Sequence, residues 1–227
     1  MENAQRHPTL YYPDGNLVVA CPSDDGPATL FRIHQAFLSS HSSVIEDMLG
    51  LPQADAANEM HDGAPVVRFN EDPKDMEIFL SFFYQPLSVS SNKYLADTEP
   101  DVAFKLFGVF RLADMLMIEP LKEKIIARVK QDWPTQLRQW DDKRHHYTIL
   151  NNNQNLTSRF PEPGSAIRLA RVFGLGMLSP LMLYELSCRD PLASYEERAT
   201  PSIGIGARWE LVSQEDRINA ERGRLNG

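Results

Sequence analysis

Cysteine is nearly absent from this chain, which has only Cys21 and Cys188 among its 227 residues. Two cysteines so far apart in sequence form neither a disulfide framework nor a zinc site, so we expect two free thiols. Long hydrophobic runs are also missing, since none reaches the roughly 20 residues that span a bilayer. Residues 1–7 lack the apolar core of a signal peptide. We therefore expect a soluble protein of the cytosol or the nucleus, with no membrane partner.

Positive charge is in the minority, because 31 acidic residues outnumber 23 basic ones and the formal net charge is −8. A generic nucleic-acid binder needs a basic surface that displaces counterions from the phosphates. The densest basic run is Lys143–His146. We interpret it as a solvated helix face, with a nuclear-import signal or a phosphate contact as the alternatives. The composition thus predicts no direct binding of nucleic acid.

The short motifs of common catalytic sites are also missing. The sequence contains no G-x-S-x-G elbow, no phosphate-binding loop, no G-x-G-x-x-G and no H-E-x-x-H. His34, His41 and Cys21 could approach one another, but a metal site needs a fuller ligand set than these three residues offer. We therefore predict no catalytic, cofactor-binding or metal site, and we expect a protein that is not an enzyme.

What the chain does contain is a clear succession of elements near its N-terminus. Residues 17–21 and 29–33 are apolar runs on either side of a polar turn, which is typical of a β-hairpin. A short helix is expected over 34–38, and a second helix begins after Ser42 or Ser43, either of which can cap it. The apolar residues of that second helix recur at helical spacing on one face: Val44, Ile45, Met48 and Leu49.

Further elements follow along the chain. Asp72 and Pro73 suit the N-cap and the first position of a helix that must end before Pro86. We interpret its aromatic-rich stripe as core. The other expected segments are a loop over 50–64, a strand over 65–69, helices over 100–116 and from 119, a polar stretch over 133–147, a mobile stretch over 151–155 and a helix from Ser213 to Arg224.

Several of these segments together resemble the BTB/POZ family over about residues 9–130. Asp14–Leu17 matches the start of the family's first hairpin, and Phe31–His34 matches its strand-to-helix junction. Ser42–Leu49 matches the helix that usually reads Ser-x-x-Phe-x-x-Met/Leu. Asp72–Pro73, followed by a helix ending in Tyr84, matches the family's next helix. The order and spacing of the four segments carry the resemblance.

Four short phrases also resemble BTB-domain proteins that are abundant in mushroom-forming (basidiomycete) fungi. They stand at Tyr11–Asn16, His41–Val44, Leu51–Gln53 and Leu169–Arg171. The resemblance implies an α+β fold in which a small sheet is flanked by helices. It also implies a BTB/POZ domain over 9–130 and an α-helical C-terminal extension over 131–227, with a flexible linker near 148–162.

The family resemblance implies a protein–protein interaction module, and one known role is substrate adaptor for a cullin-type ubiquitin ligase. The alternative is a self-associating scaffold or transcriptional regulator that uses only the BTB surface, with an unrecognised enzyme as a third interpretation. The expected partners are a cullin-like scaffold or another BTB chain, and homo-oligomers are among the expected states. We do not expect a swapped dimer, because only about a dozen residues precede the hairpin and His7–Pro8 interrupts them.

The same resemblance suggests where a partner would bind. Cullin-binding relatives carry an apolar-x-Glu motif, and the nearest match here is Met60-His61-Asp62, with Asp in place of Glu. Together with the face of the second helix, this gives six candidate partner-binding residues: Val44, Ile45, Met48, Leu49, Met60 and Asp62.

Overall fold

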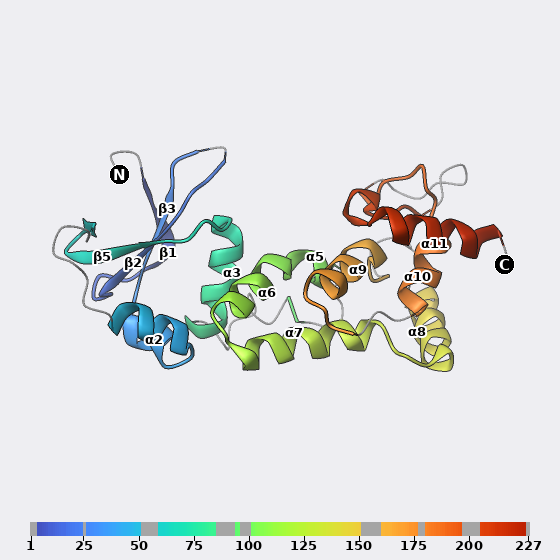
Figure 1. Ribbon diagram of the computed structural model, residues 1–227, viewed down its shortest axis with the longest axis horizontal. Helices are drawn as coiled ribbons and strands as arrows, with labels where there is room; N and C mark the ends of the chain where they lie inside the picture. The colour runs from blue at the N-terminus through green and yellow to red at the C-terminus, as the bar shows by residue number, and fades with distance from the viewer. Residues whose placement is uncertain are drawn as a thin grey trace. The chain divides into compact units, whose positions relative to one another are not determined.

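The computed structural model describes residues 4–24, 26–50, 59–84, 94–95, 101–150, 160–176, 180–196 and 205–225. The chain forms two compact units. Unit 1 comprises Met1–Asn92 with Gly108–Glu123, and unit 2 comprises Lys93–Phe107 with Lys124–Gly227. A small five-stranded sheet and many helices make up the secondary structure, so the predicted α+β class is confirmed (Figure 1). The predicted domains 9–130 and 131–227 stay a prediction.

The sheet of unit 1 has the order β1-β3-β2-β5-β4. Its strands are β1 Gln5–Tyr11, β2 Leu17–Cys21, β3 Thr29–Ile33, β4 Met60–His61 and β5 Ala64–Arg68. β2 and β3 pair antiparallel, so the predicted hairpin is confirmed, and β5 confirms the predicted third strand. β5 pairs parallel with β2, and β1 pairs parallel with β3. Two strands with apolar residues on both faces therefore lie at the centre of the sheet.

Two strands were not predicted. The expectation that His7–Pro8 interrupts the segment before the hairpin is wrong, because both residues lie within β1. β1 is an edge strand, where a proline costs no ladder hydrogen bond on the open side. The strand also has an irregular register between Arg6 and Tyr11, where the His7 Nδ1 accepts the Leu10 amide at 3.1 Å. Pro8 therefore lies within a strand whose pairing with β3 is irregular in this segment.

The second missed strand is β4, which pairs antiparallel with β5. The two strands are joined at Asp62 and Gly63, whose φ angles are 50° and 77°. An Asp-Gly pair with two positive φ angles is a common hairpin turn. The expected loop over 50–64 is therefore wrong at 60–64, while residues 51–58 lie outside the described part of the chain.

Most helices of unit 1 begin at or next to the residues that the sequence predicts. The unit contains α1 Gln35–Ser39, α2 Ser43–Gly50, α3 Pro73–Tyr84, α6 Phe107–Met115 from Gly108 onward, and the start of α7 Glu119–Asp132. Ser42, rather than Ser43, caps α2, because its Oγ accepts the Ile45 amide at 3.2 Å. Asp72 Oδ1 accepts the Lys74 amide at 2.7 Å at the start of α3, as predicted.

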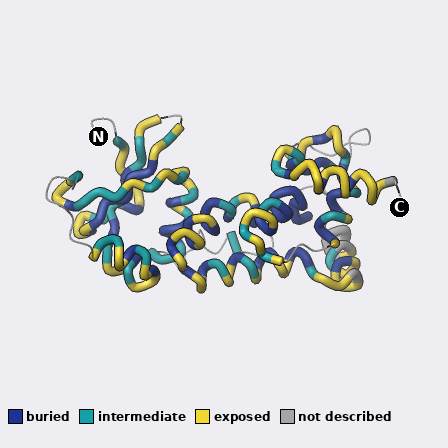
Figure 2. The backbone as a smooth tube through the Cα atoms, viewed as in Figure 1, coloured by how far each residue is buried: buried dark blue, intermediate teal, exposed yellow. Residues whose placement is uncertain are grey.

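Apolar side chains from the sheet and from α3 and α6 are buried in unit 1. β2 is buried along its whole length (Figure 2). On one face of the sheet Val18, Ala20, Leu30 and Ala64 form a cluster against which Tyr11 packs. The aromatic-rich stripe of α3 is core only in part, because Phe79 is buried but the last three residues, 82–84, are half-buried. The C-terminal end of α3 therefore presents aromatic rings at the surface of the unit.

Unit 2 is mainly helical in its described residues, with one isolated β-bridge between Ser194 and Ala207. It contains α5 Val102–Lys105, the remainder of α7, α8 Leu137–Leu150, α9 Pro163–Val172, α10 Pro180–Ser187, the 3₁₀ helix η2 Trp209–Leu211 and α11 Gln214–Leu225. Three expectations need correction. The helix over 100–116 is broken at Leu106, the polar stretch over 133–147 contains most of α8, and residues 148–150 of the expected linker belong to α8. Residues 151–159 lie outside the described residues.

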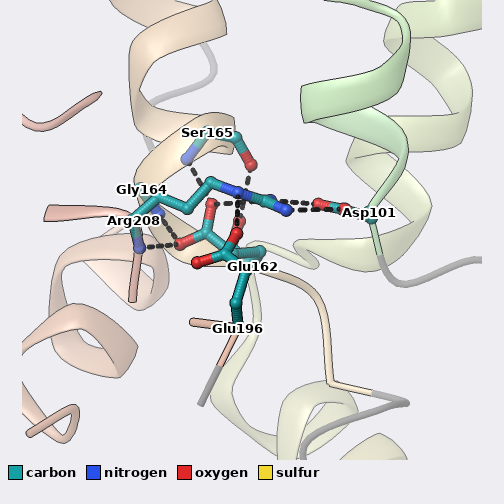
Figure 3. Close-up of polar contacts among 6 residues, drawn as sticks. All are labelled: Asp101, Glu162, Gly164, Ser165, Glu196 and Arg208. Atoms are coloured by element: carbon teal, nitrogen blue, oxygen red, sulfur yellow. Dashed lines mark hydrogen bonds and ion pairs between the residues drawn. The ribbon is translucent and has the colours of Figure 1, made fainter. Parts of the chain in front are cut away.

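A network of charges centred on the buried residues Glu162 and Arg208 holds several segments of unit 2 together (Figure 3). Arg208 forms two hydrogen bonds with the Asp101 carboxylate, and its Nε donates to Glu196 Oε1 at 3.0 Å. Glu162 caps α9 by accepting the amides of Gly164 and Ser165, and it also accepts the Arg208 amide at 3.1 Å. The helix that Glu162 caps is buried over most of its length (Figure 2). Because buried charges are costly without partners, this network fixes how these segments join.

No helix in the described residues is both long enough and apolar enough to cross a membrane.

Candidate docking surface

The predicted face of α2 is only partly accessible. Ile45 is 1% exposed, so its side chain belongs to the core of unit 1. Val44, Met48 and Leu49 are half-buried. A partner that approached α2 would therefore contact the latter three residues and not Ile45.

The other two predicted residues lie on the β4–β5 hairpin. Met60 is 56% exposed. The Asp62 carboxylate accepts hydrogen bonds from the Tyr11 hydroxyl and from the Arg6 guanidinium at 2.6 Å. The hydrogen bond from Tyr11 lowers the pKa of Asp62, while burial and then Asp62 itself raise the pKa of Tyr11. Asp62 therefore joins the hairpin to β1, and Met60 is the more accessible of the two.

A group of partly exposed aromatic rings lies elsewhere on unit 1. We call it the aromatic patch, and its members are Tyr12, His34, Phe37, His41, Phe83 and Tyr84. These rings come from the segment after β1, from α1 and the residues on either side of it, and from the last turn of α3. Three segments that are far apart in sequence thus bring their aromatic side chains to one place.

Stacking fixes the geometry of the patch. Tyr84 stacks on Tyr12 with ring centroids 4.9 Å apart and on Phe37 at 5.1 Å. His41 lies 5.2 Å from Phe83, which in turn meets Phe79 of the core edge-on at 5.1 Å. Each such pair contributes about 0.5–1.5 kcal/mol beyond the burial of its area. The patch is therefore a preformed surface anchored in the core.

Hydrogen bonds also hold the centre of the patch. The Tyr84 hydroxyl accepts the His34 amide at 2.7 Å and lies 3.2 Å from His34 Nδ1. His34 Nε2 lies 3.3 Å from an Asp14 carboxylate oxygen. Burial raises the pKa of Tyr84, and the hydrogen bond with His34 lowers the pKa of Asp14. The polar atoms of His34, Tyr84 and Asp14 thus hold one another in place at the centre of the patch.

The rings of the aromatic patch remain accessible to solvent although they stack on one another. Phe37 is 44% exposed, His41 is exposed, and Tyr12, Phe83 and Tyr84 are half-buried. Exposed apolar patches rimmed by polar groups mark interaction sites more often than isolated apolar residues do. Rigid aromatic side chains are also the commonest binding hot spots, because they bury much area at little entropic cost. The arrangement is suited to binding a protein segment.

His34, His41 and Cys21, which the sequence suggested could approach one another, are poorly arranged for holding a metal ion. Cys21 is fully buried, and burial raises the pKa of its thiol to about 12, so this thiol is neutral at physiological pH. The imidazole of His34 bonds to Tyr84 and Asp14, and the ring of His41 packs on Phe83. Across the described ranges, no three His, Cys, Asp or Glu side chains are grouped as metal ligands.

The aromatic patch is not predicted by the sequence pattern, because the aromatic-rich stripe of α3 indicates core. A signal was available, since Phe82, Phe83 and Tyr84 are consecutive. Three consecutive helical residues cover roughly 200° of the helix surface, so one buried face cannot take them all. Phe37 and Leu38 gave a similar signal, because two adjacent helical residues point in directions about 100° apart and one narrow buried face does not take both.

No protein-family model matches the sequence, and no curated protein matches it either.

Proposed function

We propose that this protein is a protein–protein interaction module, and that its unit 1 is a BTB/POZ-like domain that docks a partner through the aromatic patch. The observation that carries the proposal is the patch itself. It places Phe37, at 44% exposure, beside the stacked rings of Tyr12 and Tyr84. A partner residue packed there would desolvate rigid aromatic surface, which is the usual origin of a hot spot.

The order of elements supports the BTB/POZ-like assignment. Along unit 1 the chain runs through the β2–β3 hairpin, α1, α2, β5 and α3, which is the order that the family resemblance implies. The resemblance also favours a cullin-type scaffold as the partner, so the proposed role is substrate adaptor. Both cysteines are free thiols, which suits the reducing cytosol or nucleus.

The test is size-exclusion chromatography with light scattering, on the protein alone and mixed with a cullin N-terminal domain from the same organism. Phe37→Ala should weaken a mixed complex about tenfold or more, because hot-spot truncation costs at least about 2 kcal/mol. Met115→Ala is the matched control, since Met115 is 47% exposed on α6 of the same unit. It should leave the complex unchanged.

Other outcomes separate the alternatives. A homo-oligomer that Phe37→Ala dissociates would favour the self-associating scaffold over the adaptor. A mixed complex that survives Phe37→Ala but is lost on Met60→Ala would move the docking surface to the β4–β5 hairpin. A protein that remains monomeric and unbound in every mixture would contradict the proposal.

A further inference from the structure

A second surface feature lies in unit 2 and is independent of the proposed docking function. It is a groove between α10 and α11 with a volume of about 630 Å³. Small-molecule sites commonly measure about 300–1,000 Å³. The groove is therefore large enough to take most of a small organic ligand.

The walls of the groove are apolar on the side of α10. Pro180, Leu183 and Tyr184 line it there, and Tyr184 is 48% exposed. An aromatic ring left half in water beside two apolar side chains gains free energy when an apolar body covers it. This side of the groove suits a ring or an alkyl chain.

The α11 side of the groove is polar and carries a positive charge. Asn219 and Arg224 line it from α11. The Arg224 guanidinium donates to the carbonyl oxygens of Ser187 at 3.1 Å and Arg189 at 2.7 Å, which holds its plane in place. Both acceptors are carbonyl groups, which carry only partial charges and so do not neutralise the guanidinium. Its full positive charge therefore remains available to a ligand.

We propose that the α10–α11 groove binds an amphipathic organic anion, whose apolar body covers Leu183 and Tyr184 and whose acidic group meets Arg224. A guanidinium anchored by two carbonyl groups is pre-organised for a carboxylate or sulfonate, because less side-chain entropy is lost on binding.

Gly223 makes the proposal testable with a variant that should still fold. A Cβ atom there would lie 3.5 Å from the Ser187 Cβ, which is ordinary van der Waals contact. Gly223 also lies within α11, where replacing glycine favours the helix. Gly223→Leu therefore fills the groove without straining the backbone, while Gly223→Ala is the matched control that narrows it only slightly.

The two cysteines supply a built-in reporter. Cys188 lines the groove and is exposed, whereas Cys21 is fully buried. A ligand in the groove should shield the Cys188 thiol from iodoacetamide, and the buried thiol should contribute little to labelling of the native protein. Occupancy can thus be read at the proposed position rather than from binding alone.

The probe is anilinonaphthalene sulfonate, titrated into the full chain while its fluorescence and the rate of Cys188 alkylation are followed. We expect saturable fluorescence and a matching slowing of alkylation, both lost in Gly223→Leu and kept in Gly223→Ala. The neutral analogue phenylnaphthylamine should bind about tenfold more weakly, because it lacks a partner for Arg224.

Two results would overturn the proposal. One is fluorescence that does not saturate, or that saturates without protecting Cys188, since the probe would then bind elsewhere. The other is equal affinity for the neutral analogue, which would show that the anionic group contributes nothing to binding.

Discussion

Asp75 illustrates how one buried carboxyl group can set the pH dependence of stability. It lies in the first turn of α3, and its side chain occupies the space that Gly108 leaves open on α6. A Cβ on Gly108 would lie only 1.7 Å from Asp75 Oδ2. Burial, followed by the negative charges of Asp72 and Glu71, raises the pKa of Asp75 to about 6. The folded protein therefore binds this proton more tightly than the unfolded chain.

Asp75→Asn should stabilise the protein at neutral pH. A raised carboxyl pKa makes the free energy of unfolding fall as pH rises between about 4, the value in the unfolded chain, and about 6. The amide has no charge to lose, so the variant should gain roughly 1 kcal/mol at pH 7, a figure that allows for partial exposure of the group. Urea unfolding at several pH values measures both effects.

The expected pH profile distinguishes this explanation from a general gain in packing. The difference between Asp75→Asn and the parent should vanish below about pH 4, where both side chains are neutral. Asp47→Asn, on the exposed side of α2, is the control and should follow the parent. A gain of equal size at every pH would contradict the role assigned to this carboxyl.

At the scale of elements, the parts that could be predicted are those with strong local chemistry. The β2–β3 hairpin and the start of α3 at Asp72–Pro73 follow from apolar runs, a turn and a cap, and each is present. β1 and α8 could not be predicted from local sequence patterns. β1 contains Pro8 and is stabilised by pairing with β3, which is distant in sequence, and α8 is too polar to show an apolar period.

The docking surface was less predictable than the elements that build it. Of the six predicted residues, Ile45 is buried and Asp62 is bonded to Tyr11 and Arg6. The aromatic patch depends on contacts between residues about 50 positions apart, such as His34 with Tyr84. Contacts of this range are set by the tertiary fold, so periodicity along one element does not reveal them.

Ser42 is the residue on which the position of α2 depends. Its Oγ accepts the Ile45 amide and donates to the Leu116 carbonyl at 2.7 Å, so one buried hydroxyl both caps α2 and ties it to the end of α6. Ser42→Ala should lower the free energy of unfolding by about 1–3 kcal/mol, because a cap is lost and a buried carbonyl is left without its donor.

Ser43→Ala is the matched control for this prediction. Ser43 is the adjacent residue, it is exposed, and the sequence alone left it as an equal candidate for the cap. Its replacement should change the free energy of unfolding by less than about 0.5 kcal/mol. Equal losses in both variants, measured by urea unfolding, would show that Ser42 is not the cap that matters.

At the scale of the whole molecule, the positions of the tryptophans allow the unfolding of the two units to be followed by different spectroscopic signals. All three tryptophans, Trp133, Trp140 and Trp209, belong to unit 2. Trp133 and Trp140 stack with centroids 5.4 Å apart, and the Trp140 indole donates to Glu185 at 3.1 Å. Tryptophan fluorescence therefore reports on unit 2, whereas far-ultraviolet circular dichroism reports on both units.

This separation tests whether the two units unfold independently. Each unit contains its own buried core, so we expect fluorescence and circular dichroism to give different transitions in urea. Arg208→Ala removes the buried guanidinium that pairs with Asp101 and lies 3.9 Å from the Glu162 carboxylate, and it should destabilise unit 2 by about 3–5 kcal/mol. It should move the fluorescence transition to lower urea, while the exposed control Arg222→Ala should not.

Asp75→Asn, a variant of unit 1, should instead move only the part of the dichroism change that fluorescence does not follow. If each variant shifts both signals equally, the chain unfolds as one cooperative unit, and the continuous helix α7, which belongs to both units, would be the structural reason.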